Sequence, residues 1–152
     1  VADITRDDLS DLGTFDFIYS LGNVLSHILK PEVPGILRNI RARLAEGGLF
    51  LVDFLIKGSH FRTRIRDEYH RILWERRLDE ETGRIEMDGY FVDHDLTQHF
   101  EVWGYSIQEA LGLLEAAGFR PDGVSGRLDF STAADEESNP FCLNFRSRPG
   151  GP

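Results

Sequence analysis

Five residues that follow a short apolar run have the types and spacing of a ligand site. They are Ser20, Leu21, Gly22, Asn23 and His27. A glycine lets a ligand approach the backbone closely, and an asparagine amide can donate a hydrogen bond to a carboxylate. A histidine at this point can serve as a general base if the reacting atom arrives protonated. A simple turn, with His27 capping it or the next helix, is the alternative for these residues.

A carboxylate stands at the end of the next apolar run, where Asp53 follows residues 49–52. In an open parallel α/β sheet, ligands bind outside the carboxyl ends of the strands. Asp53 is therefore a candidate for orienting a substrate. Capping of a neighbouring loop is the alternative role for this carboxylate.

Basic and aromatic residues further along the chain are candidates for substrate contact. They are Arg62, Arg64, Tyr69, Trp74 and Tyr90. Arginines can receive an anionic group, and aromatic rings can wall an apolar pocket. A solvated charged face and a structural core are the alternatives. His94 and His99, with acidic neighbours, lack a third ligand at a recognised spacing, so we predict no metal site.

The first third of the chain has an α/β pattern that would position the loop and the carboxylate. Residues 15–19 and 49–54 are apolar without alternation, which is typical of strands covered on both faces. Between them, apolar residues recur at helical spacing at Val33, Leu37, Ile40 and Leu44. Gly47-Gly48 predicts the end of this helix and a turn into the second strand.

A different pattern fills the middle of the chain. Residues 57–67 are polar and basic, which predicts a loop or a short helix. Three strands are then predicted at residues 69–78, 84–92 and 96–105, with turns between them. These strands indicate an antiparallel meander with one solvated face, inserted into the α/β scaffold over residues 68–105.

The last third returns to the scaffold. Ser106 and Glu109 predict a capping box at the start of a helix that ends at Gly118. Two final strands are predicted at residues 119–124 and 141–145.

The order of these elements resembles the second half of a class I S-adenosylmethionine-dependent methyltransferase. The resemblance is carried by the loop L-G-N-V-L-S-H at 21–27, the G-G junction at 47–48 and the segment L-L-E-A-A-G-F at 113–119. The loop itself is similar to that of glycine and sarcosine N-methyltransferases. The resemblance implies a partial Rossmann-like sheet made of the family's last four strands, with the final strand antiparallel.

The resemblance also implies a cofactor, S-adenosylmethionine, and roles for individual residues. Asp3 matches the residue that accepts a hydrogen bond from the adenine amino group. Ser20 to Asn23 match the loop beneath the methionine part and the sulfonium. The glycine-rich cofactor motif G-x-G-x-x-G is absent from the sequence. The resemblance implies methyl transfer to a nitrogen, oxygen or carbon atom of a small molecule. Because the motif is absent, we expect the isolated chain to be inactive.

A non-catalytic partner or binding subunit, built on half of the same fold, is the alternative function. The first predicted strand lacks the neighbour that it has in the family, so we expect an open sheet edge covered by self-association or by a partner chain.

Composition argues against some classes of binding partner and against a location in a membrane. With 152 residues, 41% of them hydrophobic, the chain can form one domain with a core. The resemblance implies that this is a single partial methyltransferase domain over residues 1–152. Its net charge of −9 argues against a broad basic surface for nucleic acid. No apolar run approaches the ~20 residues that span a membrane, and no signal peptide is visible. A cytoplasmic protein with a small-molecule substrate is therefore predicted.

Overall fold

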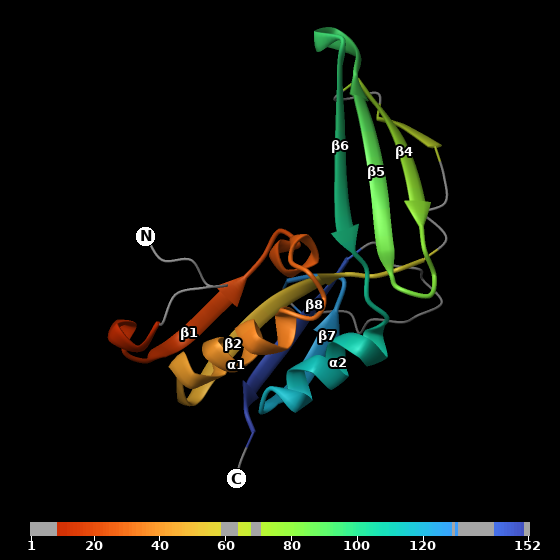
Figure 1. Cartoon of the computed structure of the whole chain (residues 1–152). Helices are drawn as coiled ribbons and strands as arrows, with labels where there is room; N and C mark the ends of the chain where they lie inside the picture. Colours follow the sequence, from red (N-terminus) through yellow and green to blue (C-terminus); the bar gives the residue numbers. More distant parts are fainter. Residues whose placement is uncertain (1–8, 59–63, 68–70, 129, 131–141, 151–152) are drawn as a thin grey trace.

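The computed structural model describes residues 9–58, 64–67, 71–128, 130 and 142–150. Two sheets divide these residues. One sheet carries both α-helices, and the second rises beyond the end of the first (Figure 1).

The first sheet has four strands in the order β1-β2-β8-β7. They are β1 (Phe15–Ser20), β2 (Leu44–Leu55), β8 (Cys142–Pro149) and β7 (Phe119–Ser125). β1 and β2 are parallel, whereas β8 is antiparallel to both β2 and β7. The final strand thus lies between its two predecessors, and the predicted α/β sheet with an antiparallel last strand is confirmed.

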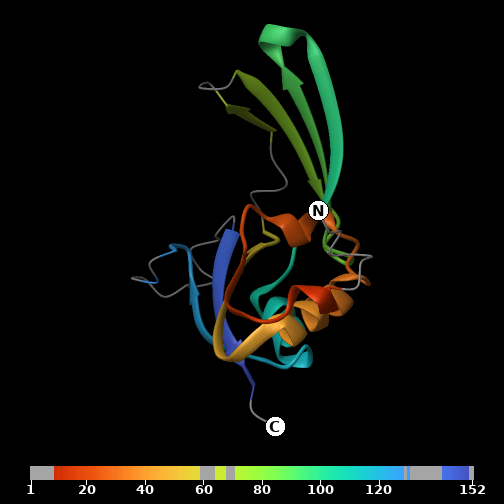
Figure 2. The same cartoon turned by 90° about the vertical axis from the view of Figure 1, so that its left-hand side faces the viewer.

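Both helices, α1 (Val33–Arg43) and α2 (Ile107–Ala116), cover the same face of this sheet (Figure 2). The face is built by alternate residues of β2, because Phe50, Val52 and Phe54 share a side and are fully buried. They pack with Ile40 and Leu114 of the helices in one core cluster. Each such side chain contributes roughly 1.5–3 kcal/mol through burial, so this face fixes how the helices sit on the sheet.

The start of α2 confirms the predicted capping box. The Ser106 hydroxyl accepts from the Glu109 N–H at 3.1 Å, and the Glu109 carboxylate accepts from the Ser106 N–H at 2.6 Å. Gly118, with φ of +86°, follows the helix end as predicted.

The predicted helix end at Gly47-Gly48 is wrong. α1 ends at Arg43, and Leu44, which was expected on the helix, is already the first residue of β2. The two glycines lie inside β2, where its pairing with β1 is irregular between Phe15 and Phe17. Gly47 has φ of +78°, which a glycine adopts without strain, so it accommodates the extra residues of β2 at this irregularity.

The second sheet is antiparallel, in the order β3-β4-β5-β6. Its strands are β3 (Arg64–Asp67), β4 (Ile72–Leu78), β5 (Arg84–Phe91) and β6 (Leu96–Trp103). β4, β5 and β6 confirm the predicted meander. β3 contradicts the predicted loop or short helix for the end of the basic segment. Backbone pairing with the free edge of β4 overrides the polar composition there.

The second sheet is fastened to the first at the end of β2. The Lys57 N–H donates to the Tyr105 carbonyl, and the Tyr105 N–H donates to the Leu55 carbonyl, each at 2.9 Å. Leu55 also joins Ile85 and Val102 in a small apolar cluster. The meander is thereby anchored through backbone and side chains at its base. Among the described residues, no helix is long and apolar enough to cross a membrane.

Candidate functional site

The predicted floor loop, residues 20–23, lies at the carboxyl end of β1 and leads into the short 3-10 helix η2 (Val24–His27). Because β1 and β2 are parallel, this end lies beside the carboxyl end of β2. Gly22 and Asn23 both have positive φ, +91° and +60°. Asn23 is a residue type that tolerates this conformation, which explains how the chain turns so tightly here.

Asp53 and the floor loop are brought together by hydrogen bonds. The Gly22 N–H donates to Asp53 Oδ2 at 2.7 Å, and the Asn23 N–H lies 3.0 and 3.1 Å from the two carboxylate oxygens. Asp53 is only 7% exposed. The carboxylate therefore caps the loop, which is the second of the two roles considered for it.

Ser26 is a further member of the site that its residue type did not reveal. Its side chain is fully buried, and its hydroxyl accepts from the Leu55 N–H at 3.4 Å. A single serine in a short loop segment gives no sequence signal for such a contact. Ser26 fastens η2 to β2 in the same region where Asp53 fastens the loop.

His27 ends η2, and its side chain is exposed. Ser20 and Leu21 are half-buried between the strand and the glycine. Ser20 and Leu21 belong to the floor loop and His27 follows it at the end of η2, and the roles of all three stay predictions. Asp3, Arg62 and Tyr69 lie outside the described residues, and Arg64 lies in β3.

A second charged cluster joins the segment after η2, the end of β2 and the start of α2. Nζ of Lys30 and Nζ of Lys57 each lie 3.3 Å from a carboxylate oxygen of Glu109. Burial by itself would raise the pKa of Glu109, but the Ser106 N–H and the two lysines outweigh it and lower the pKa to about 2. The Lys30 ammonium also lies over the ring of Tyr105, 4.7 Å from its centroid. This cluster fixes the base of the meander to the scaffold.

Trp74 and Tyr90, both predicted to contact a substrate, lie on opposite faces of the second sheet. The register pairs Trp74 with Gly89 and Leu73 with Tyr90, and successive residues of a strand face opposite sides. Trp74 packs with Phe91 and Phe100. Tyr90 donates to Asp95 at 2.9 Å. The two side chains therefore point to opposite sides of the sheet, and their contact with a substrate stays a prediction.

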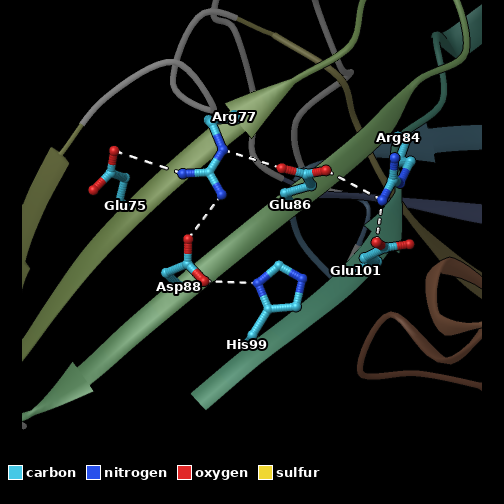
Figure 3. Close-up of polar contacts among 7 residues, drawn as sticks. All are labelled: Glu75, Arg77, Arg84, Glu86, Asp88, His99 and Glu101. Carbon is cyan, nitrogen blue, oxygen red and sulfur yellow. Dashed lines mark hydrogen bonds and ion pairs between the residues drawn. The ribbon is translucent and has the colours of Figure 1, made fainter. Parts of the chain in front are cut away.

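The Tyr90 face carries a ladder of charged residues, shown in Figure 3. Arg77 of β4 bridges Glu86 and Asp88 at 3.1 and 2.8 Å, and Arg84 pairs with Glu86 and Glu101. His99 Nδ1 lies 2.7 Å from Asp88. Hydrogen bonds from His99 and Arg77 lower the pKa of Asp88. Such cross-strand pairs stabilise a solvated sheet face.

A hollow of about 540 Å³ opens towards the far end of this face. Its lining residues include Trp74 and Tyr90 together with Arg66, Leu73, Asp88 and Thr97. Within the described part of the chain, no three histidine, cysteine, aspartate or glutamate residues come together as metal ligands.

Comparison with solved structures identifies the fold of the chain. No protein-family model matches the chain, and no curated protein sequence matches it. The CcbJ methyltransferase from Streptomyces caelestis superposes with a TM-score of 0.79 at 15% identity, over 99% of this chain and 66% of that one. An S-adenosylmethionine-dependent methyltransferase from Clostridium acetobutylicum gives 0.71 at 13% identity, over 99% and 63%. The chain has the fold of class I methyltransferases.

A third similar structure is CalS10, an amino pentose methyltransferase from Micromonospora echinaspora solved with S-adenosylmethionine bound. It is 17% identical, with a TM-score of 0.62 over 97% of this chain and 63% of that one. The chain thus spans about two thirds of the length of the solved chains that it matches. At these identities the likeness concerns the fold.

Proposed function

We propose that this chain forms the second half of an S-adenosylmethionine-dependent methyltransferase that acts on a nitrogen, oxygen or carbon atom of a small molecule. The observation that carries the proposal is the floor loop, held at the carboxyl ends of β1 and β2 in a methyltransferase fold. Ligands of open α/β sheets bind at such strand ends. The similarity of the loop to that of glycine and sarcosine N-methyltransferases supports the same location.

In this proposal the chain orients the cofactor and does not supply a nucleophile. Methyl transfer needs an acceptor held in line with the sulfonium, and orientation of this kind can be worth effective molarities of roughly 10⁵ M and above. Ser20, Leu21, Gly22 and Asn23 would lie beneath the methionine part, and Asp3 would contact the adenine. His27 would serve as the base where the acceptor arrives protonated.

The rest of the proposal concerns the domain and its surroundings. Residues 1–152 form one partial domain in the cytoplasm, and residues 68–105 are the substrate cover. Because the chain has no G-x-G-x-x-G motif, a further segment or chain would supply the glycine-rich turn.

A partner or binding subunit is the second candidate function, and the edge of the first sheet favours it. Phe15, Phe17 and Tyr19 of β1 are 42, 51 and 65% exposed, and all three lie on the face opposite the helices. A hollow of about 320 Å³ adjoins them, bordered by Leu12 and Ile40 among others. Exposed apolar patches mark contact surfaces.

Formation of S-adenosylhomocysteine separates the two candidates. The natural full-length protein, mixed with labelled S-adenosylmethionine and a panel of small amines and hydroxylated compounds, should transfer the label to at least one acceptor. A protein that binds the cofactor analogue sinefungin but transfers no methyl group would support the binding subunit instead.

A further inference from the structure

Two consecutive backbone N–H groups of the floor loop converge on one carboxylate. Gly22 and Asn23 have positive φ, and successive N–H groups in such turns form a concavity that binds anions. The Asp53 carboxylate fills this concavity, with donor–acceptor distances of 2.7, 3.0 and 3.1 Å. The anion bound by the loop is thus part of the same chain.

This carboxylate is buried, and no basic side chain among the residues that the structure describes is its partner. Asp53 is 7% exposed, and its hydrogen-bond donors in the described part of the chain are the two backbone N–H groups. Charge-assisted hydrogen bonds of this kind hold a carboxylate firmly in place. They do not cancel its negative charge, as an arginine or a lysine would.

The short helix η2, which follows the floor loop, is also held by β2. Leu55 lies two residues beyond Asp53 on β2, and its N–H donates to the buried hydroxyl of Ser26. One contact runs from the loop backbone to a β2 side chain, and the other from the β2 backbone to a side chain of η2. The loop and η2 are therefore both tied to the end of β2, and the two loop N–H groups are already used.

We propose that Asp53 is a positioning residue, which fixes the floor loop and gives it a negative charge that favours a cationic ligand centre. The proposal rests on the proposed function, in which that centre is the sulfonium of S-adenosylmethionine. A loop whose N–H groups are used offers little to an anion, whereas a buried carboxylate attracts a nearby cation. Asp53 then acts through Gly22 and Asn23 and does not bind the substrate.

The positioning part is tested by amide hydrogen exchange, followed by NMR in the natural full-length protein. Asp53→Asn should speed the exchange of the Gly22 and Asn23 amides by about ten- to a hundredfold, because a bond to a charged acceptor is lost. Asp16→Asn is the matched control. It removes the same charge from an exposed site on β1, and the two loop amides should keep their rates. Unchanged rates in Asp53→Asn would overturn the proposal.

The charge part is tested with two ligands that differ in charge at sulfur. Asp53→Asn should weaken binding of S-adenosylmethionine at least about threefold more than binding of neutral S-adenosylhomocysteine. Gly22→Ala strains the loop at φ of +91° but keeps the carboxylate, so it should speed exchange and leave the ratio of the two affinities unchanged. An equal loss for both ligands in Asp53→Asn, or a changed ratio in Gly22→Ala, would contradict the role of the charge.

Failure of the proposed function gives a different result. A wild-type full-length protein that binds neither ligand refutes methyl transfer from this cofactor. The exchange rates of the Gly22 and Asn23 amides still decide whether Asp53 fixes the loop.

Discussion

The indole ring of Trp74 covers Gly89, the residue directly opposite it on β5. A Cβ added to Gly89 would lie 2.7 Å from ring atom Cζ3, closer than real Cβ atoms come to a neighbour. The ring also meets Phe91 and Phe100 edge-on, with centroids 6.3 and 5.8 Å apart. The missing side chain at Gly89 therefore admits the indole to the core face of the second sheet.

Gly89→Ala should destabilise the protein by about 1–3 kcal/mol, because the wedged ring has to move. Urea unfolding measures the change. Gly112→Ala is the control, since it lies in α2 with open space around it and should stabilise the helix by roughly 0.5–1 kcal/mol. Equal effects of the two substitutions would show that Trp74 does not pack on Gly89 in solution.

The placement of Trp74 shows where sequence patterns lose information. Alternation along β5 correctly indicated a sheet with one wet face, but the pairing register was needed to put Trp74 and Tyr90 on opposite sides. A one-residue change of register would exchange the faces of β4 entirely. Placing the two rings relative to each other required the pairing of β4 with β5, which a single strand does not contain.

The scaffold itself was more predictable, because its signals are local. The helix α2 begins with a capping box and is followed by a glycine, and both signals were correct. Gly47-Gly48 misled, since the same residue pair can end a helix or widen a strand, and the pairing of β1 with β2 decided between them. The role of Asp53 depended on a contact with residues 31 and 30 positions away, which no local pattern encodes.

Glu109 should make the stability depend on pH in acid. Its pKa is lowered to about 2 from a usual value near 4.5, so its contribution is complete above pH 4.5 and is lost as the pH falls towards 2. Glu109→Gln keeps an acceptor for the Ser106 N–H but removes the charge facing Lys30 and Lys57. At pH 7 we expect a loss of about 1 kcal/mol, kept small by solvent screening at a side chain that is 41% exposed.

Thermal unfolding at several pH values tests this prediction. The difference between wild type and Glu109→Gln should shrink steadily as the pH falls from 4.5 towards 2. Glu115→Gln, on the same helix and exposed, is the control and should stay within ±0.5 kcal/mol, on the scale typical of surface changes. A Glu109→Gln deficit that persists undiminished in acid would assign it to packing and not to charge.

The edge strand β1 should drive association of the isolated chain. Phe17 and Tyr19 stack with their ring centroids 5.8 Å apart, and both are exposed on a strand that lies at the edge of the described sheet. An apolar edge strand is a template for pairing with another chain. Phe17→Glu combined with Tyr19→Glu should shift the protein towards monomer in sedimentation and light scattering.

The double substitution needs a control for charge and lost apolar surface. The control is Leu29→Glu combined with Leu128→Glu, because these residues are 55 and 57% exposed but lie outside β1. This control should leave the association unchanged. If wild type stays monomeric at high concentration while the β1 amides exchange slowly, the edge is not a contact surface in this chain.

The 152-residue chain alone should bind S-adenosylmethionine weakly. The floor loop is present and held by Asp53. The sequence contains no glycine-rich turn, so most contacts to the ribose and to the rest of the cofactor would have to come from elsewhere. Binding energy spread over several contacts falls steeply when most of them are missing. Isothermal titration of the chain, beside the natural full-length protein as the positive control, measures the difference.

A dissociation constant in the low micromolar range for the chain alone, which is a binding free energy of about −8 kcal/mol, would mean that the floor loop and its neighbours suffice to hold the cofactor. In that case residues 1–152 contain a complete cofactor site, and the partial-domain interpretation would have to be abandoned.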